Sequence, residues 1–390
     1  MGKKKVLFIT PSLCQGGLEH SLITMLSLLD EKKYEMYLYT YGEDLSLLPL
    51  VPQYVHFKND LLDKHYNRNL KALRLLSGEK FFSKVGKKER AERYTDKRKD
   101  FIHRQKVNQI KNAYNNLQFD VVIGNSIGMT SETAAVVNAK KRYVFFHSSV
   151  DLHHNMNVKL FPKYDGIIAV SKGVKDMLCK SYDDVEDKVI VLENYVDAEQ
   201  IIAKANERLE EVDDKLKDRL VISTCGRFSQ EKGFDLAVEC AHILKKDKGY
   251  DFLWYFIGDG AQREMLEQLI EKYDLNNNIV ITGYTENPFP YIKACDIYVQ
   301  PSYHESYGRT IKEAIILGKP IVSTDTVGGH TLLDNNNYGE IVDVSPKAIA
   351  DGIITASQKK KQNVYAQYDI RLNQEEKETY VRAIEKILDS

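Results

Sequence analysis

Short apolar runs separated by segments with helical spacing constrain the fold of this chain more than any other feature. Residues 6–10 form such a run, and apolar residues recur at helical spacing over 18–29. Further strands are predicted at 36–40, 120–124, 142–146, 166–170, 189–192, 220–225, 252–257, 279–282, 296–300, 320–323 and 340–343. Continuous apolar strands between helices are typical of parallel sheets covered on both faces, so the sequence predicts an α/β fold.

The chain is long enough for two such sheets. It has 390 residues, and a polar, charged stretch at 199–219 follows the last strand of the front half. We predict a Rossmann-like domain over 1–194 and a second over 195–373. A last helix within 374–390 either stays on the second domain or packs back on the first. Two facing sheets leave a cleft at the carboxyl ends of their strands.

A basic segment interrupts the first domain. Residues 58–111 hold 17 Lys and Arg against 7 Asp and Glu, although the whole chain has a net charge of −1. We interpret 59–116 as a basic helical insertion. Its partner is either an anionic membrane surface or only solvent, and both interpretations stay open. No recognisable nucleic-acid-binding module is present, so no nucleic acid is expected.

The cysteines and the first residues indicate the compartment. The five cysteines form no CxxC pair, which fits a reducing environment. The apolar run within residues 1–10 is too short for a secretory signal, and no run in the chain approaches the roughly 18 apolar residues of a membrane span. We expect a cytoplasmic protein, with peripheral attachment to the inner membrane face as the open alternative.

Two loops carry residues suited to an anion. Gly16 and Gly17 lie between the first predicted strand and helix, where glycine lets a ligand approach free backbone N–H groups. Arg227 and Lys232 flank the loop after residue 225, and a guanidinium with an ammonium suits a diphosphate. The alternatives are a tight turn without a ligand and two solvated cations.

A third segment follows the strand at 296–300. Glu305 lies in its loop, a helix is predicted to begin near Gly308, and Glu313 lies on that helix. The backbone amides at the helix start would face a ligand there. These amides belong to Ser306, Tyr307, Gly308, Arg309 and Thr310. Helix capping alone would explain Glu305, and Glu313 would then be a surface residue.

His147 ends the strand at 142–146, on the side where the cleft is expected. A lone histidine is more often structural than functional. His153 and His154 follow, but no Cys or carboxylate completes a zinc-like spacing, and no Asp-x-Asp is present to hold a metal-bound diphosphate. We therefore expect neither a metal nor a cofactor.

Together these segments resemble one family, the retaining GT-B glycosyltransferases with a "group 1" (family 4-like) C-terminal domain. Residues 226–233 resemble the pattern G-R-x(4)-K-G, residues 305–313 match E-x7-E, and residues 16–19 resemble the loop G-G-x-E. Tyr307 stands where Phe is commoner. The resemblance is strong over 222–329 and weak over 59–116, where acceptor recognition usually lies.

The resemblance implies roles for these residues. Arg227 and Lys232 would neutralise the donor diphosphate in place of a metal. Glu305 and His147 would contact the donor sugar, and Glu313 would bind the ribose. The backbone near Tyr284 would contact the base. Further phosphate donors would come from the amides of Gly16, Gly17, Ser306, Tyr307, Gly308, Arg309 and Thr310.

The implied activity is that of a retaining hexosyltransferase. It would move a sugar from a nucleotide-sugar donor, UDP first and GDP second, to a saccharide or lipid-linked acceptor in cell-surface polysaccharide or glycoconjugate synthesis. Attack from the face of the leaving group is favoured over double displacement, in which Glu305 would be the nucleophile. The competing hypothesis is a non-catalytic two-lobed binder of a phosphorylated ligand.

Overall fold

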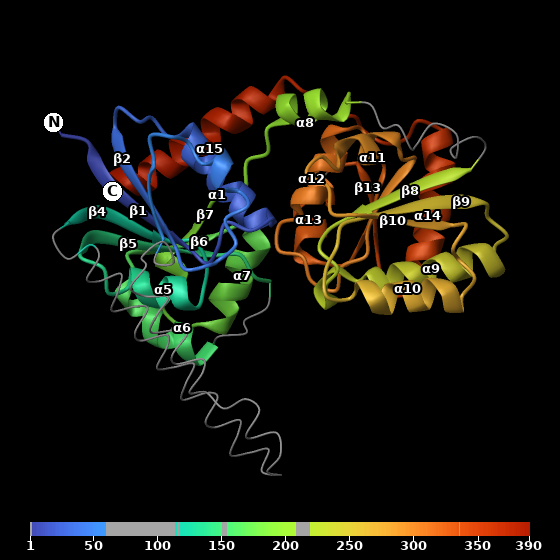
Figure 1. The fold of residues 1–390 in the computed structure, drawn as a ribbon, viewed down its shortest axis with the longest axis horizontal. Helices are drawn as coiled ribbons and strands as arrows, with labels where there is room; N and C mark the ends of the chain where they lie inside the picture. Colours follow the sequence, from blue (N-terminus) through green and yellow to red (C-terminus); the bar gives the residue numbers. More distant parts are fainter. Residues whose placement is uncertain (1, 60–113, 115–116, 150–153, 208–218, 335) are drawn as a thin grey trace, which may run out of the picture.

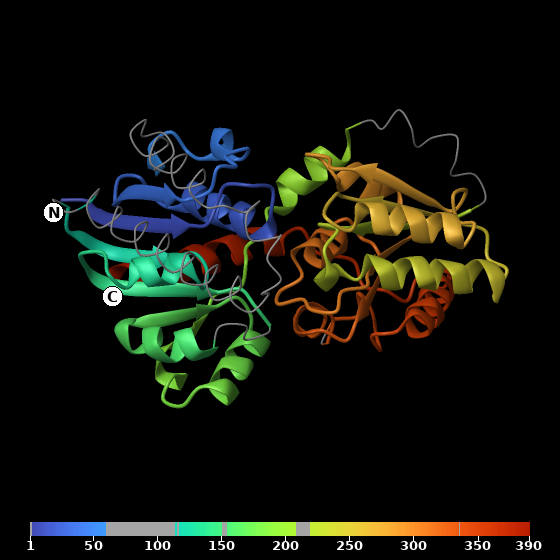
Figure 2. The ribbon, with the colours of Figure 1, turned by 60° about the horizontal axis from the view of Figure 1, so that its bottom comes forward.

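The computed structural model describes residues 2–59, 114, 117–149, 154–207, 219–334 and 336–390. The chain forms two lobes, and each lobe is a parallel sheet with helices packed on it (Figures 1 and 2). The predicted basic insertion at 59–116 lies outside the described residues, except for Asn59 and Tyr114.

The first sheet has seven described strands, all paired in parallel. Their order is β3 (His56–Asn59), β2 (Tyr34–Thr40), β1 (Lys4–Thr10), β4 (Phe119–Gly124), β5 (Ala139–Phe146), β6 (Gly166–Ala169) and β7 (Val189–Val191). The described helices of this lobe are α1 (Gly17–Leu28), α5 (Met129–Ala134), α6 (His154–Leu160) and α7 (Lys172–Ser181). The central strands are buried on both faces, which explains their continuous apolar runs.

The second sheet has six described strands, also parallel. Their order is β10 (Ile279–Gly283), β9 (Phe252–Ile257), β8 (Leu220–Cys225), β11 (Ile297–Gln300), β12 (Ile321–Thr324) and β13 (Gly339–Val342). Its helices are α8 (Ala198–Ala205), α9 (Phe234–Lys246), α10 (Arg263–Lys272), α11 (Phe289–Ala294), α12 (Arg309–Ile316), α13 (Val327–Leu333) and α14 (Pro346–Lys361). Trp254 lies fully buried in its core, and its indole N–H donates to the Thr224 hydroxyl over 3.0 Å.

The chain crosses from the first lobe to the second after β7, and α8 already packs on α11 and α12. It returns through α15 (Leu372–Asp389), which runs onto the first lobe, so that both chain ends lie there (Figure 1). Lys4 forms an ion pair with Asp389 over 3.0 Å, and Lys33 forms one with Glu385 over 2.8 Å. The C-terminal helix therefore ties the second lobe to the first.

The structure differs from the sequence prediction at one strand and one helix. The edge strand β3 was not predicted, because Lys58 and Asn59 break its apolar pattern and, among the described strands, it pairs only with β2. The helix α8 was not predicted either, since its short amphipathic pattern stands inside polar sequence. The predicted strands are all present: β8 and β9 have the predicted bounds, and the ends of the others differ by at most three residues.

Candidate active site

A cavity of about 470 Å³ lies where the carboxyl ends of the two sheets face each other. This volume is within the range of sites that hold small ligands. Nine of the residues predicted to bind the donor line the cavity: Gly16, Gly17, Arg227, Lys232, Tyr284, Glu305, Arg309, Thr310 and Glu313. The topology thus brings together residues from the loop after β1, the loop after β8 and the start of α12.

Lys232 and Glu305 form an ion pair in the wall of the cavity. The Lys232 ammonium lies 2.7 Å from Glu305 Oε2, and the Glu305 side chain is only 12% exposed. Lys232 ends a 3-10 turn (Gln230–Lys232), and Gly233 follows with a φ of +65°. A side chain at Gly233 would collide with the Pro301 carbonyl oxygen, so glycine lets this loop pack directly against the loop that carries Glu305.

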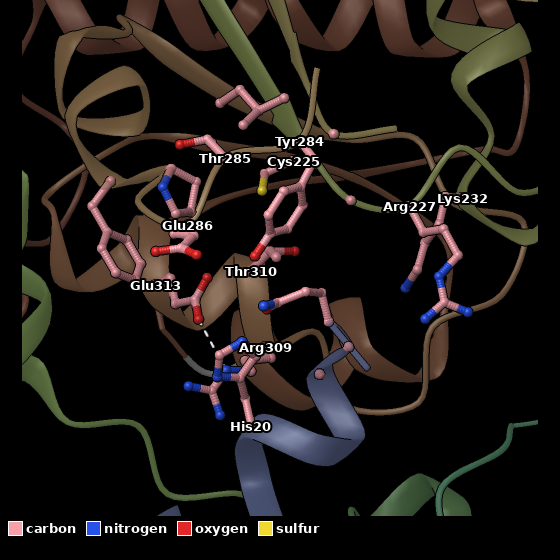
Figure 3. Close-up of a pocket in the computed structure, with 18 of the residues that line it drawn as sticks. His20, Cys225, Arg227, Lys232, Tyr284, Thr285, Glu286, Arg309, Thr310 and Glu313 are labelled. Carbon is pink, nitrogen blue, oxygen red and sulfur yellow. Dashed lines mark hydrogen bonds and ion pairs between the residues drawn. The ribbon is translucent and has the colours of Figure 1, made fainter. Parts of the chain in front are cut away.

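Arg227 reaches the glycine turn of the other lobe. Its Nη2 would lie 3.3 Å from a Cβ built at Gly16, a contact tighter than most. Figure 3 shows Arg227 beside Lys232 at one end of the cavity. The absence of a side chain at Gly16 therefore lets a cation from the second lobe approach the glycine turn that begins α1, beside the Glu19 carboxylate.

Arg309 and Glu313 form a second ion pair, one turn apart on α12. The Arg309 Nε lies 3.0 Å from Glu313 Oε1, and the Glu313 side chain is 8% exposed (Figure 3). Burial raises the pKa of Glu313, and the charge and hydrogen bond of Arg309 oppose this rise. Arg309 also donates to the Ser21 hydroxyl over 3.4 Å, so it joins α12 to the first lobe.

The residues before α12 hold the helix start in place rather than lining the cavity. Gly308 caps the helix with a φ of +82°. The Ser306 carbonyl accepts a hydrogen bond of 2.8 Å from the Ser171 hydroxyl of the first lobe. Tyr307 is buried on the opposite side of α12, where it lines a separate cavity of about 650 Å³. Ser306, Tyr307 and Gly308 are therefore near the cavity wall but outside it.

His147 also lies outside the cavity wall. Its ring stacks on Phe145 with a centroid distance of 5.3 Å. Burial lowers its pKa to about 4, against a smaller opposing effect of the Asn125 backbone. Its Nε2 is buried and has no hydrogen-bond partner among the described residues. The structure thus places a neutral imidazole, with one ring nitrogen unpaired, at the end of β5.

Comparison with known proteins bears on this geometry. Residues 205–371 match the family model described as glycosyl transferases group 1. The chain carries a group 1 glycosyltransferase domain. The match covers the segments with the anion-binding loops and α12, and it confirms the family resemblance of the motifs at 226–233 and 305–313.

Curated relatives of the group 1 domain are similar over part of their length. A 4-alpha-N-acetylgalactosaminyltransferase of Campylobacter jejuni, which is named for an N,N'-diacetylbacillosaminyl-diphospho-undecaprenol substrate, is 28% identical over 47% of this chain and 48% of that protein. The lipopolysaccharide core biosynthesis glycosyltransferase LpsE of Rhizobium meliloti is 27% identical over 40% of this chain and 44% of its own length. The chain thus spans about half the length of these curated relatives.

Solved structures match the whole chain. Alr3699/HepE of Anabaena, in complex with UDP and glucose, has a TM-score of 0.69 at 16% identity and covers 99% of both chains. A glycosyltransferase from Rickettsia africae has a TM-score of 0.66 at 19% identity, over 98% of this chain and 99% of its own. These likenesses confirm the predicted fold, two Rossmann-like domains facing across a cleft (GT-B).

The sequence did not point to several residues that line the cavity beside the group 1 motifs. Gln200 and Lys204 reach it from α8, and His20 reaches it from α1. Further such residues are Gln15, Cys225, Thr285, Glu286, Pro288 and Phe289. The lining residues Gly226 and Glu231 lie in the predicted segment 226–233, and Ile257, Gly258 and Asp259 lie in a segment, 257–260, whose sequence resembles a strand-end signature of the family. His20 lies one helical turn after Gly16, and this spacing is the one signal that could have indicated it.

The described residues provide neither a metal-binding cluster nor a membrane-spanning helix. No group of three or more His, Cys, Asp or Glu side chains is placed to hold a metal ion within the part of the chain that the structure describes. None of the described helices has the length and apolar character needed to span a membrane. The expectation that no metal is needed stays a prediction.

Proposed function

We propose that this chain is a retaining glycosyltransferase that takes a sugar from a nucleotide-sugar donor, with UDP as the first candidate nucleotide. The observation that carries the proposal is the convergence of Arg227, Lys232 and the Gly16 turn at one end of a cavity that holds the Arg309–Glu313 pair at the other. Cations with backbone amides suit a diphosphate, and a buried carboxylate suits a pair of hydroxyl groups.

The proposed diphosphate site works through charge. Arg227 is exposed in the cavity, and Lys232 stands beside it with its ammonium directed at Glu305. Two fixed cations would stabilise the negative charge that grows on the departing diphosphate, the work that a metal performs in other enzymes. The backbone amides of Gly16 and Gly17 and the start of α12 would add hydrogen bonds to the same group.

The sugar would lie between the diphosphate and the first lobe. Glu305, held by Lys232, would contact it near the reacting carbon. His147, whose Nε2 is buried outside the cavity wall, would contact a hydroxyl once the lobes close on the donor. In the proposed step the bond from the anomeric carbon to the diphosphate oxygen breaks, and the acceptor oxygen bonds to the same face of that carbon. The acceptor proton passes to the departing diphosphate oxygen. No covalent bond to Glu305 forms.

The proposed acceptor is a saccharide or a lipid-linked saccharide. Support comes from the curated relatives, one named for a diphospho-undecaprenol substrate and one for lipopolysaccharide core biosynthesis. The basic segment 58–111 would hold the enzyme at an anionic membrane surface on its cytoplasmic side. Flotation with vesicles of acidic lipid checks this part: binding that survives removal of the lysines in 80–88 would count against it.

A donor screen tests the activity. Release of UDP or GDP is measured with each common nucleotide sugar, with a saccharide acceptor mixture and without it. We expect acceptor-dependent release from one donor, unchanged by a metal chelator. The rival, a non-catalytic binder, is separated by Glu305→Gln: a transferase should lose turnover and keep nucleotide affinity, whereas a binder has no turnover to lose. No release from any nucleotide sugar would refute the proposed activity.

A further inference from the structure

One residue of the donor cavity has no part in the roles given so far. His20 lies on α1 of the first lobe, and its side chain reaches the cavity wall. It stands close to Arg309, the residue that is paired with Glu313 (Figure 3). This part of the cavity, beside the Gly16–Gly17 turn, is therefore shared by a residue from each lobe.

The surroundings of His20 keep its ring uncharged. Burial, together with the positive charges of Arg309 and Lys204, lowers its pKa to about 4. At neutral pH the imidazole thus offers one N–H donor and one acceptor nitrogen. No hydrogen bond joins either ring nitrogen to another of the described residues. A polar ring that lines a cavity without such a partner is available to a ligand.

The glycine turn holds the backbone of His20. The His20 backbone N–H donates to the Gly16 carbonyl over 3.0 Å, and the hydroxyl of the next residue, Ser21, accepts a hydrogen bond of 3.4 Å from Arg309 of α12. The backbone of His20 is therefore tied both to the turn that meets Arg227 and to the helix that carries Glu313.

We propose that His20 binds the ribose of the donor nucleotide, opposite Glu313, so that each lobe contributes one hydrogen-bonding group to the sugar of the nucleoside. This inference rests on the proposed function. Ribose is assigned to His20 because Arg309, the charge that acts most strongly on the ring, is paired with Glu313, the proposed ribose ligand, whereas Arg227 and Lys232 are assigned to the diphosphate. The His20 ring carries no charge at neutral pH. It pairs well with a hydroxyl, which both donates and accepts.

The proposal gives α1 a role in donor affinity. Closure of the lobes would bring His20 onto the ribose, and loss of one hydrogen bond to a neutral partner costs about 1 kcal/mol, or about fivefold in affinity. Because the partner is a single hydroxyl, the effect should vanish when that hydroxyl is absent from the ligand. This dependence separates a direct contact from a change in the shape of the cavity.

Calorimetric titration of the full chain tests the contact. The ligand is UDP or GDP, whichever binds wild type more tightly. The 2'-deoxy and 3'-deoxy forms of that nucleotide are titrated as well. The proteins are wild type, His20→Ala, His20→Gln and Ser27→Ala. Ser27 is exposed on the same helix, and among the described residues its hydroxyl bonds only the Ile23 carbonyl of that helix, so it serves as the control. Thermal unfolding checks that each variant is folded.

We expect His20→Ala to weaken binding about fivefold, His20→Gln to weaken it less, and Ser27→Ala to leave it unchanged. One of the two deoxy nucleotides should bind wild type and His20→Ala with the same affinity, because it lacks the hydroxyl that His20 contacts. If the loss of either ribose hydroxyl weakens binding by the same factor in wild type and in His20→Ala, the ribose contact is overturned. The transferase proposal would remain intact. Failure of wild type to bind either diphosphate would instead overturn the proposed function, and the inference with it.

Discussion

The Lys232 ammonium lies 2.7 Å from Glu305 Oε2, which links the two loops that the group 1 motifs predict to hold the donor. Lys232 belongs to the loop after β8, and Glu305 to the loop before α12. The pair sets the distance between the proposed diphosphate cation and the proposed sugar contact. Each side chain is largely shielded from solvent, so removal of one leaves the other without its compensating charge.

Replacement of Lys232 by Ala should lower kcat about 100-fold, because the departing diphosphate loses one of its two fixed cations. Lys232→Arg should recover part of the loss, because arginine restores the positive charge but carries it on a planar guanidinium group. Steady-state kinetics with the donor found in the screen measure both. Lys347→Ala is the matched control: its ion pair with Asp351 lies on the surface of α14, where such pairs contribute little. An equal effect of both replacements would rule out a special role for Lys232.

Gly16 and Gly17 provide a pair of neighbouring substitutions with different surroundings. A Cβ at Gly16 would collide with the Glu19 carboxylate and crowd Arg227, whereas at Gly17 the nearest atom, Arg309 Cδ, is 4.0 Å away. We expect Gly16→Ala to reduce kcat/KM about 10-fold or more and Gly17→Ala to change it little. Thermal unfolding should differ by only a few degrees between the two. A Gly17→Ala variant that is the more damaged would contradict this account of the turn.

Glu313 should contribute to nucleoside binding and not to diphosphate binding. Glu313→Gln keeps the size of the side chain but removes the charge that accepts hydroxyl protons, so UDP affinity should fall about 10-fold. Inorganic pyrophosphate, which lacks a ribose, should bind this variant and wild type alike. Calorimetric titration measures both. A matching loss for pyrophosphate would show that Glu313 acts on the phosphate site.

The pH dependence of UDP binding follows from the same carboxylate. Burial raises the pKa of Glu313, so it takes up a proton at a higher pH than an exposed glutamate and then accepts hydroxyl protons poorly. The affinity of wild type should therefore fall as the pH is lowered from 7.5 to 5. UDP also takes up a proton near pH 6, so the informative quantity is the ratio of wild-type to Glu313→Gln affinity. That ratio should decrease with falling pH, and a constant ratio would contradict the assignment.

The sequence predicted the parts of the molecule that have a local signature. The buried strands were visible because both faces of each sheet are covered, as at β9 with its six buried residues. The loop residues Arg227, Lys232 and Glu305 were visible because the backbone that holds them needs glycine at fixed spacings, as at Gly233 and Gly308. These backbone requirements can be recognised from neighbouring residues in the sequence.

Contacts across the cleft had no such signature. Gln200 and Lys204 reach the cavity from α8, and nothing in their local sequence distinguishes them from residues of any amphipathic helix. His20 reaches it from α1, and its spacing from Gly16 was its one signal. The direction of Tyr307 was equally hidden, because the side of α12 it faces depends on how the helix packs. These features depend on the placement of two lobes and a returning C-terminal helix, which only the folded chain defines.

Calorimetric titration of UDP and GDP into wild type, Arg227→Ala and Lys232→Ala measures the central claim directly, since it asks whether this cavity holds a nucleoside diphosphate through these two cations. We predict that one of the two nucleotides binds wild type, and that each replacement weakens binding about 10-fold or more while a metal chelator changes nothing. Absence of binding by both nucleotides, or binding that neither replacement alters, would contradict the account.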